Sequence, residues 1–181
     1  MDIGRLIKRL KKGEDQAFRE LVFSYSSKLL TTARVYCYRT REAEDILQDS
    51  FIIIFQKIQS FKGDTEGALL AWMRQIVRNK AFSRNRLFQV KNERSVGEYF
   101  VEIEITPEAL SNLSCNEIMD LVLELPDGYR QVFALYAIEG YSHKEIAALL
   151  DISVSGSRSQ LSRAKQSLQS KFTQLSKINY K

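Results

Sequence analysis

Apolar side chains recur every three or four positions along most of the chain, which is typical of helices that bury one face. The clearest stripe consists of Phe18, Leu21, Tyr25, Leu29, Ala33 and Tyr36. A second helix is expected from Arg41, with Thr40 as its cap, and it should end near Phe61–Gly63. A third helix should follow a loop over 62–67 and carry Trp72, Ile76, Val77 and Phe82. Because the 181 residues include only eight glycines and two prolines, we expect an all-α fold.

Five consecutive apolar residues, Phe51 to Phe55, interrupt this spacing. At about 100° per residue, one side of a helix would gather the core residues Leu47, Phe51, Ile54, Phe55 and Ile58. Ile52 would then lie off that side, and Ile53 nearly opposite it. Either Ile53 belongs to a docking surface together with Gln48 and Asp49, or the N-terminal helix covers it.

The C-terminal part predicts a helix-turn-helix. Ser142 and Glu145 fit a capping box at the start of a short helix whose core residues are Ile146, Ala147 and Leu150. A turn over 151–153 leads to a longer helix with Leu161, Ala164 and Leu168 on one face and Ser, Gln and Arg elsewhere. Such side chains can reach base edges and phosphates in the major groove of DNA. An ordinary αα-hairpin is the alternative.

Charge is divided into blocks. The net charge is +5, but 74–94 and the residues after Asp151 are basic, whereas 95–127 contains eight acids and no Lys or Arg. Basic blocks of one sign suit a polyanion such as nucleic acid. The acidic middle, with its Gly, Pro, Ser and Asn, is typical of a linker between two small helical domains. We therefore divide the chain into 1–94, a linker 95–113, and a four-helix domain 114–181 that contains the helix-turn-helix.

Other classes of protein find no support in the sequence. No apolar run approaches the roughly 20 residues of a membrane span, and the N-terminus lacks the pattern of a secretion signal, so a cytoplasmic protein without membrane insertion is expected. Cys37 and Cys115 have no partners at metal-ligand spacing, which predicts reduced thiols and no metal site. His143, the only histidine, lies in the capping box. We expect neither an enzyme nor a cofactor.

Two segments in order resemble a known family. The sequence EGYSHKEIAALLDISVSGSRSQLSRAKQSL resembles region 4 of bacterial RNA polymerase sigma factors, and AEDILQDSFIIIFQKIQSF followed by AWMRQIVRNKAF resembles their region 2. A chain with only these regions is similar to the extracytoplasmic function (ECF) group. The resemblance implies a sigma factor that binds core RNA polymerase, through the clamp helices of the largest subunit and the beta flap, and directs initiation at promoter DNA. It also implies an anti-sigma protein as a partner.

The resemblance assigns residues to three surfaces. Those implied to bind polymerase are Asp45, Gln48 and Asp49, with Ile53 added from the apolar run; stabilisation of the helix N-terminus is the alternative for the acids. Those implied to act at the minus-ten element, where a flipped base is captured and the backbone is held, are Phe61, Lys62, Gly63, Asp64, Arg74, Arg78, Asn79, Arg84 and Arg86. Trp72 is interpreted as core because it is in register with Ile76, rather than as a stacking platform.

The minus-thirty-five element is assigned to the last helix. The residues implied to contact it are Ser155, Ser157, Arg158, Ser159, Gln160, Arg163 and Lys165. Gly156 departs from the family pattern: either it allows close approach to DNA or the helix begins one residue later. The alternative function is an autonomous helix-turn-helix activator or repressor that binds its operator without polymerase.

Overall fold

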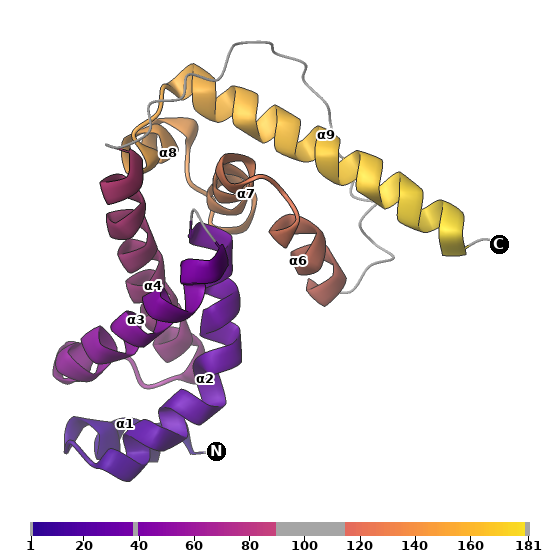
Figure 1. The fold of residues 1–181 in the computed structure, drawn as a ribbon. Helices are drawn as coiled ribbons and strands as arrows, with labels where there is room; N and C mark the ends of the chain where they lie inside the picture. The colour runs from indigo at the N-terminus through magenta and orange to yellow at the C-terminus, as the bar shows by residue number, and fades with distance from the viewer. Residues whose placement is uncertain (1, 38–39, 90–114, 180–181) are drawn as a thin grey trace. The chain divides into compact units, whose positions relative to one another are not determined.

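The computed structural model describes residues 2–37, 40–89 and 115–179 (Figure 1). These residues form helices and short connections without a strand, which confirms the expected all-α fold. The chain divides into two compact units, Met1–Lys91 and Asn92–Lys181, which are called unit 1 and unit 2 below. The expected linker, 95–113, lies outside the described residues.

Unit 1 is built around three packed helices. Its described elements are α1 (Ile3–Lys11), α2 (Asp15–Tyr36), the 3-10 helix η1 (Thr40–Glu42), α3 (Ala43–Lys57), the 3-10 helix η2 (Ile58–Ser60) and α4 (Glu66–Gln89). Helices α2, α3 and α4 pack against one another, and α1 packs on α2 and η2. The expected stripe of α2 is confirmed as core, except that Phe18 is only half-buried.

The register of α4 differs by one position from the expectation. Its fully buried residues are Leu69, Met73, Val77 and Ala81, which recur every four residues and face α2 and α3. Trp72 and Ile76 stand beside this line and are half-buried. The expected line through Trp72 and Ile76 is therefore a flank of the core, and the small Ala81 lets the helices approach closely.

Helix α3 begins and packs differently from the expectation. It starts at Ala43 after the 3-10 turn η1, so Thr40 does not cap it, and it ends at Lys57 before η2. Phe55 was expected in the core but is 44% exposed, whereas Ile46 and Ser50 are fully buried. Ser50 fits because its hydroxyl donates to the Ile46 carbonyl at 2.6 Å, which satisfies the polar group inside the core.

Unit 2 contains the expected four-helix arrangement. Its described elements are α6 (Cys115–Leu123), α7 (Asp127–Phe133), a π-helical turn η3 (Ala134–Ile138), α8 (His143–Leu150) and α9 (Val154–Asn179). The predicted core residues of α8 and α9, which are Ile146, Ala147, Leu150, Leu161, Ala164 and Leu168, are all buried. In η3 the Glu139 amide donates to the Ala134 carbonyl at 3.1 Å, as a π turn requires.

Arg130 joins α6 to α7. Its side chain is 3% exposed, and Nη1 donates to the carbonyls of Leu125 at 3.2 Å and Leu123 at 3.4 Å. Nη2 donates to the Asp127 carboxylate at 2.7 Å. Asp127 is the first residue of α7 and acts as the counter-ion of Arg130. The guanidinium therefore satisfies carbonyls at the end of α6 that have no helical partner.

Replacing Arg130 by Met should destabilise unit 2 by about 2–4 kcal/mol, because the carbonyls and the Asp127 carboxylate lose a buried charged partner. Urea unfolding followed by far-ultraviolet circular dichroism measures both units, while the fluorescence of Trp72, the only tryptophan, measures unit 1. The exposed Arg158→Met on α9 should change stability by about 0.5 kcal/mol or less. Equal effects of the two substitutions would contradict the role of Arg130.

Candidate nucleic-acid interface

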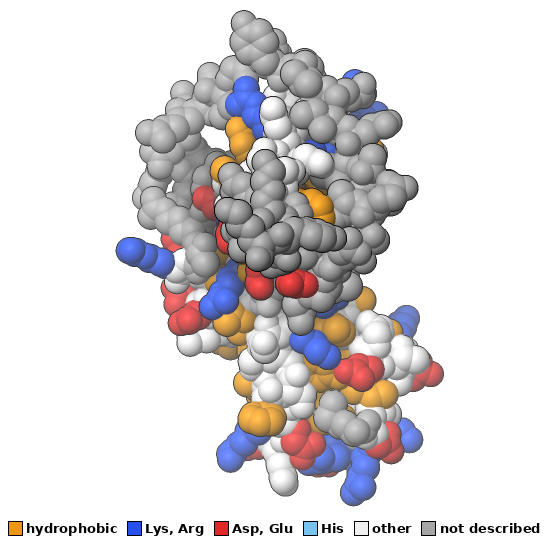
Figure 2. Space-filling view, turned by 90° about the vertical axis from the view of Figure 1, so that its right-hand side faces the viewer, with side chains coloured by type: hydrophobic (Ala, Val, Ile, Leu, Met, Phe, Trp, Pro, Cys, Tyr) orange, Lys and Arg blue, Asp and Glu red, His pale blue; other side chains and the backbone are white. Residues whose placement is uncertain are grey.

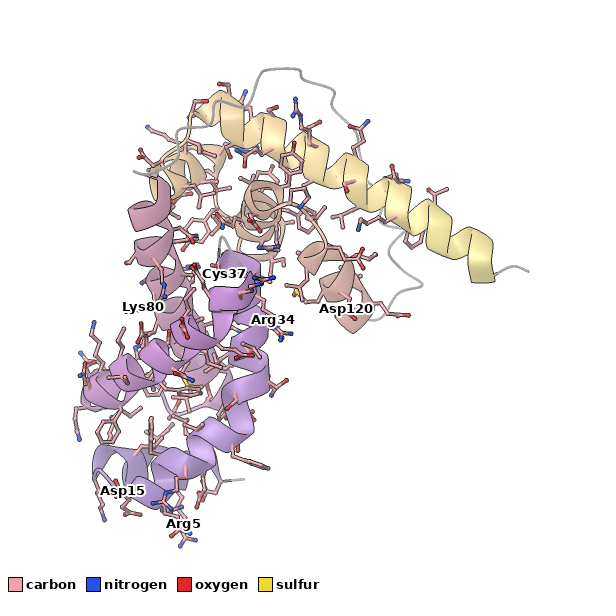
Figure 3. All side chains as sticks on the ribbon, in the orientation of Figure 1. Arg5, Asp15, Arg34, Cys37, Lys80 and Asp120 are labelled. Carbon is pink, nitrogen blue, oxygen red and sulfur yellow. The ribbon has the colours of Figure 1, made fainter. Side chains whose placement is uncertain are left out.

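The acids of α3 face two basic residues of α4 (Figure 3, where Lys80 is labelled). Lys80 Nζ lies 3.0 Å from Asp49 Oδ2, and Arg84 Nη2 lies 3.3 Å from Asp45 Oδ2. Arg84 also lies 3.8 Å from Asp49 and 3.8 Å from Glu42. The structure thus brings together residues that the family resemblance assigned to different partners: Asp45 and Asp49 to polymerase, and Arg84 to DNA. In this arrangement Arg84 is directed at the acids of its own unit.

These ion pairs are weak because water reaches them. Asp45 and Asp49 are 62% and 40% exposed at the side chain, and Arg84 is 32% exposed. Pairs of this kind contribute about 0–1 kcal/mol each. Both carboxylates therefore remain accessible to a basic partner.

An apolar patch lies on the same helix. Ile52 is 57% exposed, whereas Ile53 is half-buried. Phe55 extends the patch, with its ring edge-on to Phe18 at 5.0 Å between centroids. Gln48, about one helical turn before Ile52, is also exposed. Ile52, which the sequence did not indicate as a docking residue, presents more apolar surface than Ile53.

The expected base-capturing loop is built around Phe61. This side chain is 6% exposed and packs on Trp72, with the ring centroids 5.1 Å apart. A Cβ atom on Gly63 would lie 2.5 Å from Phe61 Cζ and 2.9 Å from Ala68 Cβ, so only glycine fits there without displacing the ring. Phe61 supports the loop from below, while Lys62 and Asp64 are exposed.

The basic residues of α4 divide by exposure. Arg74 and Asn79 are exposed, whereas Arg78 is 8% exposed. Burial argues against the expected contact between Arg78 and a phosphate. Arg86 lies on α4, but its side chain is outside the described residues.

The helix-turn-helix forms as expected. The Ser142 hydroxyl accepts from the Glu145 amide at 3.3 Å, and the Glu145 carboxylate accepts from the Ser142 amide at 2.8 Å, which completes the predicted capping box. Asp151 then adopts the left-handed conformation with φ of 55°. Ser153 Oγ accepts from the Gly156 amide at 2.9 Å.

Gly156 lies in the first turn of α9, which begins at Val154 and not later. A Cβ atom at Gly156 would lie 3.0 Å from Ser153 Oγ. That contact is tight, so the absence of a side chain at Gly156 leaves room for the hydroxyl that bonds its amide.

Several residues assigned to the minus-thirty-five element face inward. Ser157 is fully buried and Ser159 is 7% exposed, which excludes both side chains from a surface contact in this arrangement. Gln160 is half-buried beside Gly128 of α7, and Arg163 donates to the Tyr129 hydroxyl at 3.2 Å. Arg158 is exposed, and Ser155 and Lys165 are half-buried. The sequence could not separate the buried from the exposed residues of this set, because all of them are polar and lie within one helix.

His143 connects α8, η3 and α9. Its Nδ1 lies within hydrogen-bond distance of Ser157 Oγ, at 2.9 Å, and its ring stacks on Tyr136 of η3 with centroids 4.7 Å apart. Burial, and then the charges of Arg158 and Lys165 on α9, lower the pKa of His143. His143, which the sequence placed in the capping box, thus holds the beginning of α8 against α9 in its neutral form.

Comparisons with known proteins match both units. A model of sigma-70 region 2 matches residues 21–86, and a model of sigma-70 region 4 matches residues 115–168. The chain belongs to the sigma-70 family. ECF RNA polymerase sigma-E factor of Haemophilus influenzae is 28% identical, over 94% of this sigma factor and 95% of the relative. ECF RNA polymerase sigma factor SigW of Bacillus subtilis is 29% identical, over 97% and 99%.

Two solved structures are also similar to this sigma factor. One contains CnrH in complex with the cytosolic domain of CnrY, at 23% identity, 94% and 96% coverage and a TM-score of 0.47. The other contains the sigma factor RpoE with the anti-sigma factor NepR from Bartonella quintana, at 24% identity, 84% and 94% coverage and a TM-score of 0.46. Sigma factors are initiation factors and not enzymes. No helix in the part of the chain that the structure describes is long and apolar enough to cross a membrane.

Replacing Gly63 by Ala in this sigma factor should destabilise unit 1 by about 1–3 kcal/mol, because the added methyl group collides with the packed Phe61 ring. Gly67→Ala is the matched control: a Cβ there meets nothing within 4 Å, and alanine in a helix should be neutral or stabilising by up to about 1 kcal/mol. Urea unfolding followed by Trp72 fluorescence measures both. Equal stabilities of the two variants would show that the Phe61 ring moves aside for the added methyl group and would contradict the prediction.

Unit 2 should lose stability as the pH falls below about 6.5, the unfolded pKa of histidine. Because the pKa of His143 is lower in the folded state, its stabilising contribution is complete above the unfolded pKa near 6.5 and is lost as the pH falls through the folded pKa. His143→Asn should remove this dependence, and the chain has no other histidine. The measurement is urea unfolding by circular dichroism across this pH range. Identical pH profiles of stability for the variant and the wild type would contradict the role of His143.

Proposed function

We propose that this ECF sigma factor binds core RNA polymerase and directs initiation at promoters whose minus-thirty-five and minus-ten elements it recognises. The observation that carries the proposal is the occurrence of regions 2 and 4 in this order within one chain, with relatives aligned along more than nine-tenths of it. Residues 1–94 would engage polymerase and the minus-ten element, and residues 114–181 the minus-thirty-five element, on either side of the linker 95–113.

The polymerase contact is assigned to the outer side of α3. Asp45, Gln48 and Asp49 offer accessible carboxylate and amide groups, and Ile52 and Ile53 add apolar surface. An acidic patch with an apolar spot suits a basic surface on the partner, here the clamp helices of the largest subunit. The proposal includes the beta flap as a contact of the second unit, an anti-sigma protein as a regulator, and action in the cytoplasm.

The minus-ten contact is assigned to the loop and to the exposed part of α4. Lys62 and Asp64 are exposed on the loop, where Gly63 packs against the Phe61 ring. Arg74 and Asn79 are exposed on the following helix. A captured base needs polar partners above an apolar wall, which this loop offers. Arg78 is left out because it is buried.

The minus-thirty-five contact is assigned to the first turns of α9. Arg158 is the exposed cation there, and Ser155 and Lys165 are partly accessible. Val154, an apolar residue that is 40% exposed, can contact a thymine methyl group. Ser157 and Ser159 support this surface from the core.

Run-off transcription tests the function. With core polymerase and a pool of genomic promoter fragments, the protein should yield discrete transcripts, and Arg158→Ala should lower the product by about tenfold or more, the effect of losing one good base or phosphate contact. Ser170→Ala, exposed farther along α9, should retain the wild-type yield.

The autonomous regulator gives the opposite pattern. If the free protein bound a promoter duplex tightly and specifically and no template gave a transcript with core polymerase, the sigma-factor function would be wrong. An equal loss of product with Ser170→Ala would instead contradict the assignment of Arg158.

A further inference from the structure

Helix α1 carries a basic face that includes three exposed cations. Its sequence contains Arg5, Lys8, Arg9 and Lys11 and no acid, and Lys12 follows as its C-cap. Arg9 is neutralised within the unit by Glu14 and Glu20, each at 2.8 Å. Arg5, Lys8 and Lys12 are exposed, and the ion pairs among the described residues do not include them.

The three exposed cations share one side of the helix. At about 100° per residue, Arg5, Lys8 and Lys12 fall within an arc of about 60°. Figure 2 shows Lys and Arg side chains, with acids among them, at the lower end of the molecule, where Figure 1 places α1. Arg5, labelled in Figure 3, projects outward from α1.

The apolar side of α1 is already occupied. Leu6, Ile7 and Leu10 are 2%, 5% and 3% exposed in the core of unit 1. A basic amphipathic helix binds a membrane strongly when it inserts its apolar face among lipids. Because that face is buried here, the partner must be recognised by charge, which favours a polyanion.

Two hydrogen bonds attach α1 to the base of the minus-ten loop. Lys11 Nζ donates to the Phe61 carbonyl at 2.7 Å, and the side-chain amide of Gln59 donates to the Lys11 carbonyl. Lys12 and Lys62 directly follow the bonded pair in sequence, and both are exposed. The carboxyl-terminal end of the basic face of α1 is therefore attached to the beginning of the loop.

We propose that α1 is part of the minus-ten interface and that Arg5, Lys8 and Lys12 hold phosphates of the melted strand next to the captured base. This inference rests on the proposed function of the loop. The eight residues from Arg5 to Lys12 span about 10 Å of helix, which reaches about two or three successive phosphates of a strand whose phosphates are at least about 3.4 Å apart. The face thus supplies backbone affinity and no base specificity.

The test is the salt dependence of DNA binding by the complex of core polymerase and sigma factor. The probe is a promoter fragment with a premelted minus-ten region. In the triple variant Arg5→Gln, Lys8→Gln, Lys12→Gln, the slope of log K against log salt should become shallower by about 2, since each single-strand phosphate contact contributes about 0.7. Raising the salt fourfold should therefore weaken the wild type about 20-fold more than the variant.

The matched control removes the same charge elsewhere on unit 1. Arg19→Gln, Lys28→Gln, Arg41→Gln changes three exposed cations outside α1 and should keep the wild-type slope. Trp72 fluorescence should show that both triple variants unfold at the wild-type urea concentration, because every substituted side chain is exposed.

An unchanged slope in the α1 variant would overturn the inference. If that variant also binds core polymerase more weakly, the face would be assigned to polymerase instead. Arg74→Gln and Lys62→Gln separate this failure from that of the proposed function. If they flatten the slope and the α1 variant does not, α1 alone is excluded; if none of these substitutions flattens it, the minus-ten assignment itself falls.

Discussion

The packing of Phe61 on Trp72 organises the proposed nucleic-acid surface of unit 1. Gly63, which has no side chain, leaves space for the Phe61 ring beneath the loop. The Phe61 backbone carbonyl accepts a hydrogen bond from Lys11 of α1, and the ring packs on Trp72 of α4. One aromatic contact thereby joins three segments that are distant in the sequence. Loop position, the orientation of α1 and the start of α4 all depend on this ring staying where it is, since close-packed cores transmit even small changes of volume.

The ion pairs between α3 and α4 in unit 1 leave their acids accessible to solvent. Asp45 and Asp49 stand opposite Lys80 and Arg84 in exposed pairs, which stabilise the fold only slightly. A basic partner can replace these counter-ions at little loss of stability. Buried Arg130 in unit 2 is the opposite case, because its guanidinium donates to two backbone carbonyls and to the Asp127 carboxylate inside its own unit.

The sequence predicted those features that depend on local pattern. The helical fold, the stripe of α2 and the capping box at Ser142 follow from spacing and capping chemistry, which act within a few residues. The errors arose where packing between elements decides. The helical spacing placed Phe55 on the core face of α3. In the structure α3 turns Ile46 and Ser50 inward instead, because α2 and α4 contact it on two sides.

Polar residues posed the harder problem for the site. Ser157 and Ser159 look like DNA contacts, but Ser157 is buried with His143 as its partner and Ser159 is buried as well. Arg78 looks like a phosphate contact and is also buried. A sequence pattern states which side chains are polar, whereas only the tertiary structure states which polar groups are satisfied internally.

The buried serines of α9 limit how the specificity of this protein can be redesigned. Anyone seeking an orthogonal promoter would naturally randomise the whole polar run from Ser155 to Gln160. Larger residues at Ser157 or Ser159 would disrupt packing before they altered recognition, because neither side chain has space around it. A productive library would vary Val154, Ser155 and Arg158 and keep the two inward serines fixed, so the evolvable part of the helix is much narrower than its composition suggests.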